Sequence, residues 1–71
     1  MKIETLIKMA NNIGDFFNAE SNKEIAADGI KKHILRSWDP RMRRELIAYC
    51  RQDGAALSDL VRAAVSGLDQ V

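Results

Sequence analysis

The sequence is poor in the residues that cross-link small domains. It has one cysteine, Cys50, and one histidine, His33. A single thiol excludes a disulfide within the chain, and one Cys with one His is too few for a structural zinc site. A chain of 71 residues buries only a modest fraction of its surface, so its core alone gives little stability. We therefore expect stability to come from close helix packing or from a partner protein.

The patterns that mark most enzyme sites are also missing. The sequence has no glycine-rich phosphate loop and no metal-ligand cluster, and Cys50 and His33 fall on different expected helices. We interpret His33 as a packed side chain, with a base or ligand as the alternative, and Cys50 as a small buried hydrophobe. The sequence therefore predicts a binding module that has no catalytic residue, no metal and no cofactor of its own.

Long apolar stretches are absent as well. No run approaches the ~18 residues that a membrane span needs. The start, Met1 to Glu4, leads into an amphipathic pattern instead of the apolar region of a signal peptide. We expect a cytoplasmic protein without membrane contact, organised as a single helical domain over residues 1–71.

What the sequence does have is apolar residues at helical spacing. This spacing predicts an all-α fold, a small bundle of about four short helices over residues 3–17, 22–37, 40–52 and a segment after Ser58. Phe16 and Phe17 are expected in the core, with docking of one of them into another protein as the alternative. Ile25 and Leu35 lie off the main apolar stripe, as exposed residues or as a second contact face. The predicted core consists of Leu6, Ile13, Ile30, Ile34, Trp38, Leu46, Tyr49, Val61 and Val65.

Local signals place the helix ends. Ser21 and Glu24 have the capping-box spacing, and Asp39 before Pro40 predicts an N-cap followed by proline at the first helical position. Gly54 is expected to end the third helix in the left-handed conformation.

The first expected helix contains a glycine, Gly14, and a polar face that includes Asn11. Gly14 costs ~1 kcal/mol relative to alanine inside a helix, which would be explained by close approach of another backbone. Asn11 shares the face opposite the apolar stripe with Lys8 and Asp15.

Charge is unevenly distributed along the chain. The whole chain has a net charge of +1, but residues 31–51 hold seven basic and two acidic residues. In the third helix, Arg44 and Arg51 lie seven residues apart on one side, with Arg41 beside them and Arg43 on another side. Arginine suits planar pairing with carboxylates, so a partner-binding face is one interpretation and a solvated face is the other. A small nucleic-acid-binding domain that uses residues 31–51 is the alternative function.

Two motifs carry a resemblance to a known family. The segment Trp38 to Arg44 reads W-D-P-R-M-R-R, and Met9 to Phe17 reads M-A-N-N-I-G-D-F-F. Together with His33 and Ile34 ahead of Trp38, they resemble the delta subunit of the soluble, NAD-dependent, molybdenum- or tungsten-containing formate dehydrogenases. The resemblance covers roughly residues 3–65.

The resemblance implies a non-catalytic accessory subunit that supports assembly or stability of the enzyme complex. Its partners would be the other subunits, which carry the molybdopterin, the iron–sulfur clusters and the flavin. We expect no nucleic acid as a partner, and a homo-oligomer in isolation stays open. The residues hypothesised to bind the partner are Trp38, Arg41, Arg43, Arg44, Arg51 and Phe16.

Overall fold

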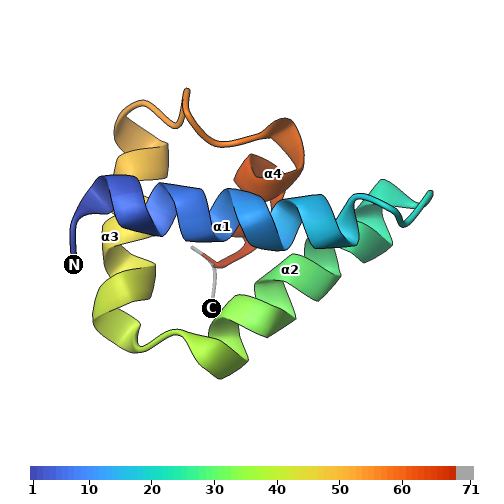
Figure 1. The fold of residues 1–71 in the computed structure, drawn as a ribbon, viewed down its shortest axis with the longest axis horizontal. Helices are drawn as coiled ribbons and strands as arrows, with labels where there is room; N and C mark the ends of the chain where they lie inside the picture. The colour runs from blue at the N-terminus through green and yellow to red at the C-terminus, as the bar shows by residue number, and fades with distance from the viewer. Residues whose placement is uncertain (69–71) are drawn as a thin grey trace.

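A computed structural model describes residues 1–68 of the chain. It contains α1 (Ile3–Phe17), α2 (Lys23–Ser37), α3 (Pro40–Gln52) and α4 (Asp59–Leu68), and residues 1–68 include no strand (Figure 1). The all-α prediction is therefore confirmed. The first three helices begin and end within one residue of the predicted limits, and α4 begins directly after Ser58 as predicted. The last three residues of the predicted domain, 69–71, lie outside the described part.

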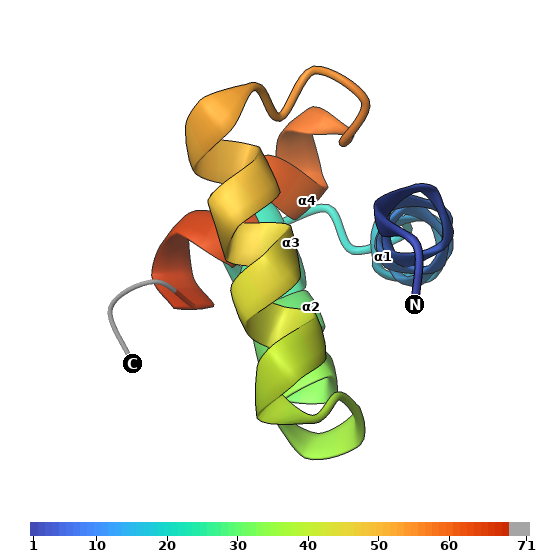
Figure 2. The same ribbon diagram turned by 90° about the vertical axis from the view of Figure 1, so that its left-hand side faces the viewer.

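The helices cross one another around a shared core. Helix α1 contacts each of the other three helices, and so does α4, which packs most extensively against α2. Figure 2 shows α1 end-on beside the upright α3, and Figure 1 shows the same steep crossing from the front. Because successive helices cross steeply, short connections are enough to join them.

The core agrees largely with the prediction. Of the nine predicted core residues, seven are buried, while Ile13 and Tyr49 are half-buried and pack against the others. Leu57 is a core residue that sequence reasoning missed, since it lies in the α3–α4 loop and is only 3% exposed. Leu57 follows four polar or small residues and belongs to no helix, so the spacing of apolar residues in helices does not predict its burial.

Helix starts follow side-chain caps, with one correction. The capping box at Ser21 was wrong, because the Asn22 side chain instead accepts hydrogen bonds from the backbone N–H groups of Glu24 and Ile25. Asp39 caps α3 as predicted, since its Oδ1 accepts from Met42 N–H at 2.9 Å. Asparagine and serine are both good N-caps, so adjacent candidates could not be ranked from sequence.

Two glycines have the special roles that were predicted for them. Gly54 has φ of 69°, in the left-handed region that favours glycine. A Cβ at Gly14 would lie 2.5 Å from Cγ2 of Val61, so α1 and α4 approach closely at this point. The neighbour at Gly14 is a side chain of α4, whereas the sequence had suggested a backbone.

Asn11, on the polar face of α1, is hydrogen-bonded to the α3–α4 loop. Its Nδ2 donates to Ala56 O at 2.9 Å, and its Oδ1 accepts from Ser58 N–H at 3.0 Å. The hydroxyl of Tyr49 accepts from Ala56 N–H at 3.0 Å. These bonds fix the α3–α4 loop against α1 and α3, and thereby set the position of α4.

Candidate protein-interaction site

The α2–α3 corner, residues 37–40, is built on a buried tryptophan. Trp38 is 5% exposed and belongs to the core cluster, and its backbone N–H donates to Ile34 O at 2.8 Å to end α2. Pro40 then begins α3 directly. Trp38, hypothesised to bind a partner, therefore offers almost none of its ring to another protein while the fold is intact.

Arg43 is also part of this corner. Its side chain is half-buried, and its guanidinium donates to Trp38 O at 2.8 Å and to Leu35 O at 3.4 Å. These carbonyls belong to the last turn of α2, where cations and hydrogen-bond donors are favourable. The structure thus gives Arg43 a role within the fold that its place in an arginine-rich run did not suggest.

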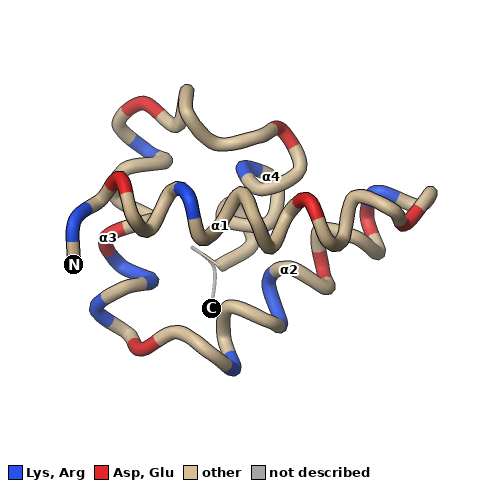
Figure 3. Tube along the Cα trace, in the orientation of Figure 1, with Lys and Arg blue, Asp and Glu red and all other residues tan. Residues whose placement is uncertain are grey.

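The remaining arginines form what we call the arginine face: Arg41, Arg44 and Arg51 on the outer side of α3. All three side chains are exposed. Arg51 has a contact within the chain, whereas Arg41 and Arg44 have no ion-pair partner among residues 1–68. Figure 3 shows further Lys and Arg positions in the second half of α2, so basic side chains lie on both sides of the α2–α3 corner.

Phe16 and Phe17 have different environments, although they are adjacent. Phe17 is half-buried and its ring packs on Gly29 of α2, where an added Cβ would lie 2.6 Å away from it. Phe16 is 77% exposed and meets Phe17 edge-on, with the ring centroids 5.2 Å apart. The expectation that both rings are core residues is therefore wrong for Phe16.

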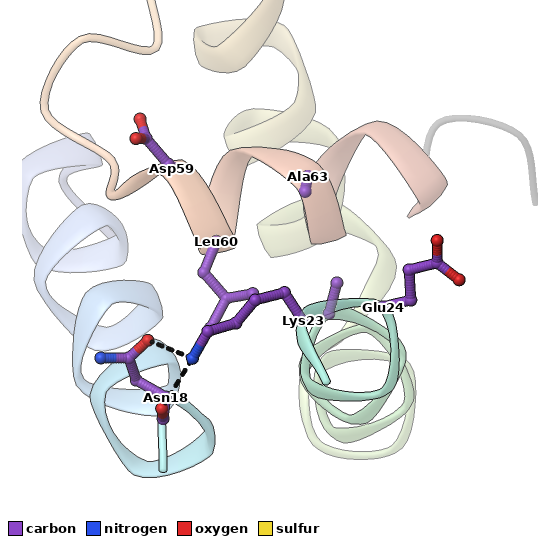
Figure 4. A pocket seen from close by; sticks show the side chains of 7 residues that line it. Asn18, Lys23, Glu24, Asp59, Leu60 and Ala63 are labelled. Atoms are coloured by element: carbon purple, nitrogen blue, oxygen red, sulfur yellow. Dashed lines mark hydrogen bonds between the residues drawn. The ribbon is translucent and has the colours of Figure 1, made fainter. Parts of the chain in front are cut away.

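A cleft of about 440 Å3 lies where the N-terminal ends of α2 and α4 meet (Figure 4). Its apolar part comes from Ala27, Leu60 and Ala63. At the rim, Lys23 Nζ donates to Asn18 O and Oδ1 at 2.9 and 3.2 Å, and turns toward α1. The cleft was missed at the sequence level because it forms only where residues more than 30 positions apart meet.

The next features concern the metal-binding and reactive side chains of the described residues. Within residues 1–68, no three His, Cys, Asp or Glu side chains are placed to hold a metal ion. Cys50 is half-buried in α3, and His33 in α2 lies beside the Phe17 ring, with centroids 6.4 Å apart. None of the four helices is long and apolar enough to cross a membrane. The described side chains thus form a helical module with charged and apolar surfaces.

Comparison with protein families identifies this module. Residues 5–65 match the family described as "NADH-dependant formate dehydrogenase delta subunit FdsD". The match spans most of the chain and includes both motifs on which the resemblance rested. The chain belongs to this family of formate dehydrogenase delta subunits. No curated protein and no solved structure gives a significant match to it.

Proposed function

We propose that this chain is a non-catalytic accessory subunit that supports assembly or stability of an NAD-dependent formate dehydrogenase. In this proposal the molybdopterin, the iron–sulfur clusters and the flavin are bound by other subunits. The membership of the delta-subunit family carries the proposal, because it makes the other subunits the natural partners. The structure supports the proposal with exposed charged and apolar surfaces, namely the arginine face and the Phe16 side chain.

The arginine face is the surface that we propose for the main contact. Arg41 and Arg44 are exposed and have no carboxylate partner among residues 1–68. Arginine pairs with carboxylates in planar, bidentate geometry, and it is enriched at protein interfaces. An acidic surface of the large or flavin subunit is therefore the partner that fits this face. No feature of the structure or family specifically favours the nucleic-acid alternative.

Charge reversal tests this face. We expect Arg41→Glu/Arg44→Glu to leave the chain helical but to lower co-purification with the other subunits, since truncating one half of a desolvated charge pair costs ~2–5 kcal/mol. Lys2→Glu/Lys8→Glu is the matched control, because it makes the same change of charge at two exposed positions, the N-cap of α1 and the outer side of α1. Circular dichroism checks the fold of both variants. Equal retention of the two variants would show that the arginine face is only solvated.

The accessory role makes a separate prediction about rates. Complex prepared without this chain should be obtained in lower yield, while formate-dependent NAD reduction per molybdenum or tungsten centre stays unchanged. A lower rate per intact centre would instead place the chain in catalysis.

A further inference from the structure

The α1–α2 corner, residues 16–25, leaves two large apolar side chains in solvent. Phe16 is 77% exposed and Ile25 is 58% exposed, and the other large apolar residue comparably exposed within residues 1–68 is Met1. The two belong to one end of the molecule, where α1 ends and α2 begins (Figure 1). Large apolar side chains left exposed at one end of a small domain, among charged residues, are candidates for a protein interaction site.

The Phe17 ring lies between the two helices at this corner. Phe16 meets Phe17 edge-on, Phe17 lies on Gly29, and Ile25 precedes Gly29 by one turn of α2. Helical spacing puts Ile25 and Gly29 on the same side of α2. The absence of a side chain at Gly29 thus lets the Phe17 ring lie directly on α2, on the side of the helix that also carries Ile25.

Hydrogen bonds hold the turn between the two helices. Lys23 Nζ donates to Asn18 O, Asn18 Oδ1 and Glu20 O at 2.9–3.2 Å, and Glu20 Oε1 accepts from Asn22 N–H at 3.0 Å. Asn22 also caps α2. A surface that is already ordered loses less conformational entropy when it binds.

The charge of this end is opposite to that of the arginine face. Residues 15–28, the corner with the adjoining residues of both helices, hold four acidic residues and one basic residue, a net charge of −3, whereas residues 31–51 have a net charge of +5. One of the four, Asp28, is ion-paired with Lys32 of the same helix at 2.9 Å, which leaves Asp15, Glu20 and Glu24 as the carboxylates without an ion-pair partner among residues 1–68. The one basic residue, Lys23, has its ammonium occupied by the oxygens of the turn. Figure 3 shows Asp and Glu positions concentrated where α1 ends and α2 begins.

We propose that the α1–α2 corner is a second docking surface, which takes a basic surface of a neighbouring subunit with Phe16 and Ile25 as apolar anchors. The partner surface would present Lys or Arg around an apolar depression, because complementary charges surround apolar anchors at specific interfaces. This inference rests on the proposed function, and it places the chain between two subunit surfaces of opposite charge.

Photo-crosslinking in the co-expressed complex identifies the occupant. We place benzoylphenylalanine at position 16, at position 44 of the arginine face, and at position 8 on the outer side of α1 as a control. Position 16 should crosslink to a Lys/Arg-rich segment of another subunit, position 44 to an Asp/Glu-rich segment, and position 8 to neither.

The outcomes separate this inference from the proposed function. A crosslink at position 44 without one at position 16 would overturn the second docking surface and leave the accessory role standing. A crosslink from position 16 to a second copy of this chain would also overturn it. Failure of the chain to co-purify with any subunit would instead contradict the proposed function.

Substitutions then measure the contribution of the corner. Phe16→Gln/Ile25→Gln should weaken association at least about tenfold, as is typical of truncating central anchors. Asp15→Lys should also weaken it, and this change is mild for the fold, since a cation is favourable in the last turn of α1. Glu4→Lys makes the same charge change at the other end of α1, where a cation is unfavourable for the helix. It is therefore the stricter control for the fold, and association should be unchanged in it as long as circular dichroism shows the helices retained. Equal association of Asp15→Lys and Glu4→Lys would contradict the role of charge.

Discussion

The two corners at the ends of α2 use aromatic side chains in opposite ways. At the α2–α3 corner, Trp38 is 5% exposed, whereas at the α1–α2 corner Phe16 is 77% exposed. The first corner is closed by the Asp39 cap and by Arg43 bound to backbone carbonyls. The second is equally well hydrogen-bonded, through Lys23, but its outermost ring has no cover.

The difference shows that a turn of this domain can be held by hydrogen bonds whether or not its aromatic side chain is buried. Both corners are fixed by local polar contacts, and the α2–α3 corner is in addition anchored in the core by its buried ring. Burial of Trp38 adds to the core, while Phe16, which is mostly exposed, adds little to folding and leaves apolar area for a partner. If this difference is correct, similar substitutions at the two corners should change the stability of the fold by different amounts.

The largest expected effect is on the buried ring. Trp38→Ala should lower the free energy of unfolding by roughly 3–5 kcal/mol, because it removes a large side chain from the core. Phe16→Ala should lower it by about 1 kcal/mol or less, since it removes mainly the edge contact with Phe17. Urea denaturation of both variants measures the difference. Comparable losses would show that the corners do not differ as described.

A smaller effect is expected for the arginine that closes the α2–α3 corner. Arg43→Met removes the donor to the Trp38 and Leu35 carbonyls, and should cost roughly 1–3 kcal/mol of stability. Arg44→Met, one residue later on the exposed side, should change stability by about 0.5 kcal/mol or less. Thermal unfolding compares the two. If Arg44→Met is the more destabilising, Arg43 is not a structural residue.

The smallest effect is expected for the glycine beneath the exposed corner. At Gly29→Ala the new Cβ meets the half-buried Phe17 ring, which has room to shift, and the gain in helix propensity offsets the contact. We expect a net change within about 1 kcal/mol. Gly14→Ala should cost roughly 1–3 kcal/mol, because Val61 is fully buried and cannot move aside. Calorimetry measures the melting temperatures of the two variants. Equal melting temperatures would contradict this contrast.

The fold was largely predictable because local signals agreed with one another. Apolar spacing gave the four helices, and Asp39 with Pro40 gave the start of α3. Leu57 and Asn11 could not be assigned from spacing. The burial of one and the hydrogen bonds of the other depend on how the α3–α4 loop lies against α1.

The interaction surfaces were predictable only in part. Sequence spacing separated Arg43 from Arg44 and Arg51, but only the structure shows Arg43 bound to the end of α2. The exposure of Phe16 was one of two stated alternatives, since an aromatic pair at a helix end fits either core or surface. The α2–α4 cleft depends on contacts between distant helices, which no local pattern encodes.

The central claim is that this chain works as a subunit of a formate dehydrogenase. The most direct measurement is to isolate the tagged chain from its native host and analyse the bound proteins for molybdenum or tungsten, iron and flavin. We predict that larger subunits that contain these groups co-purify and that the preparation reduces NAD with formate. Recovery of the chain alone, or with proteins that contain none of these groups, would contradict the claim.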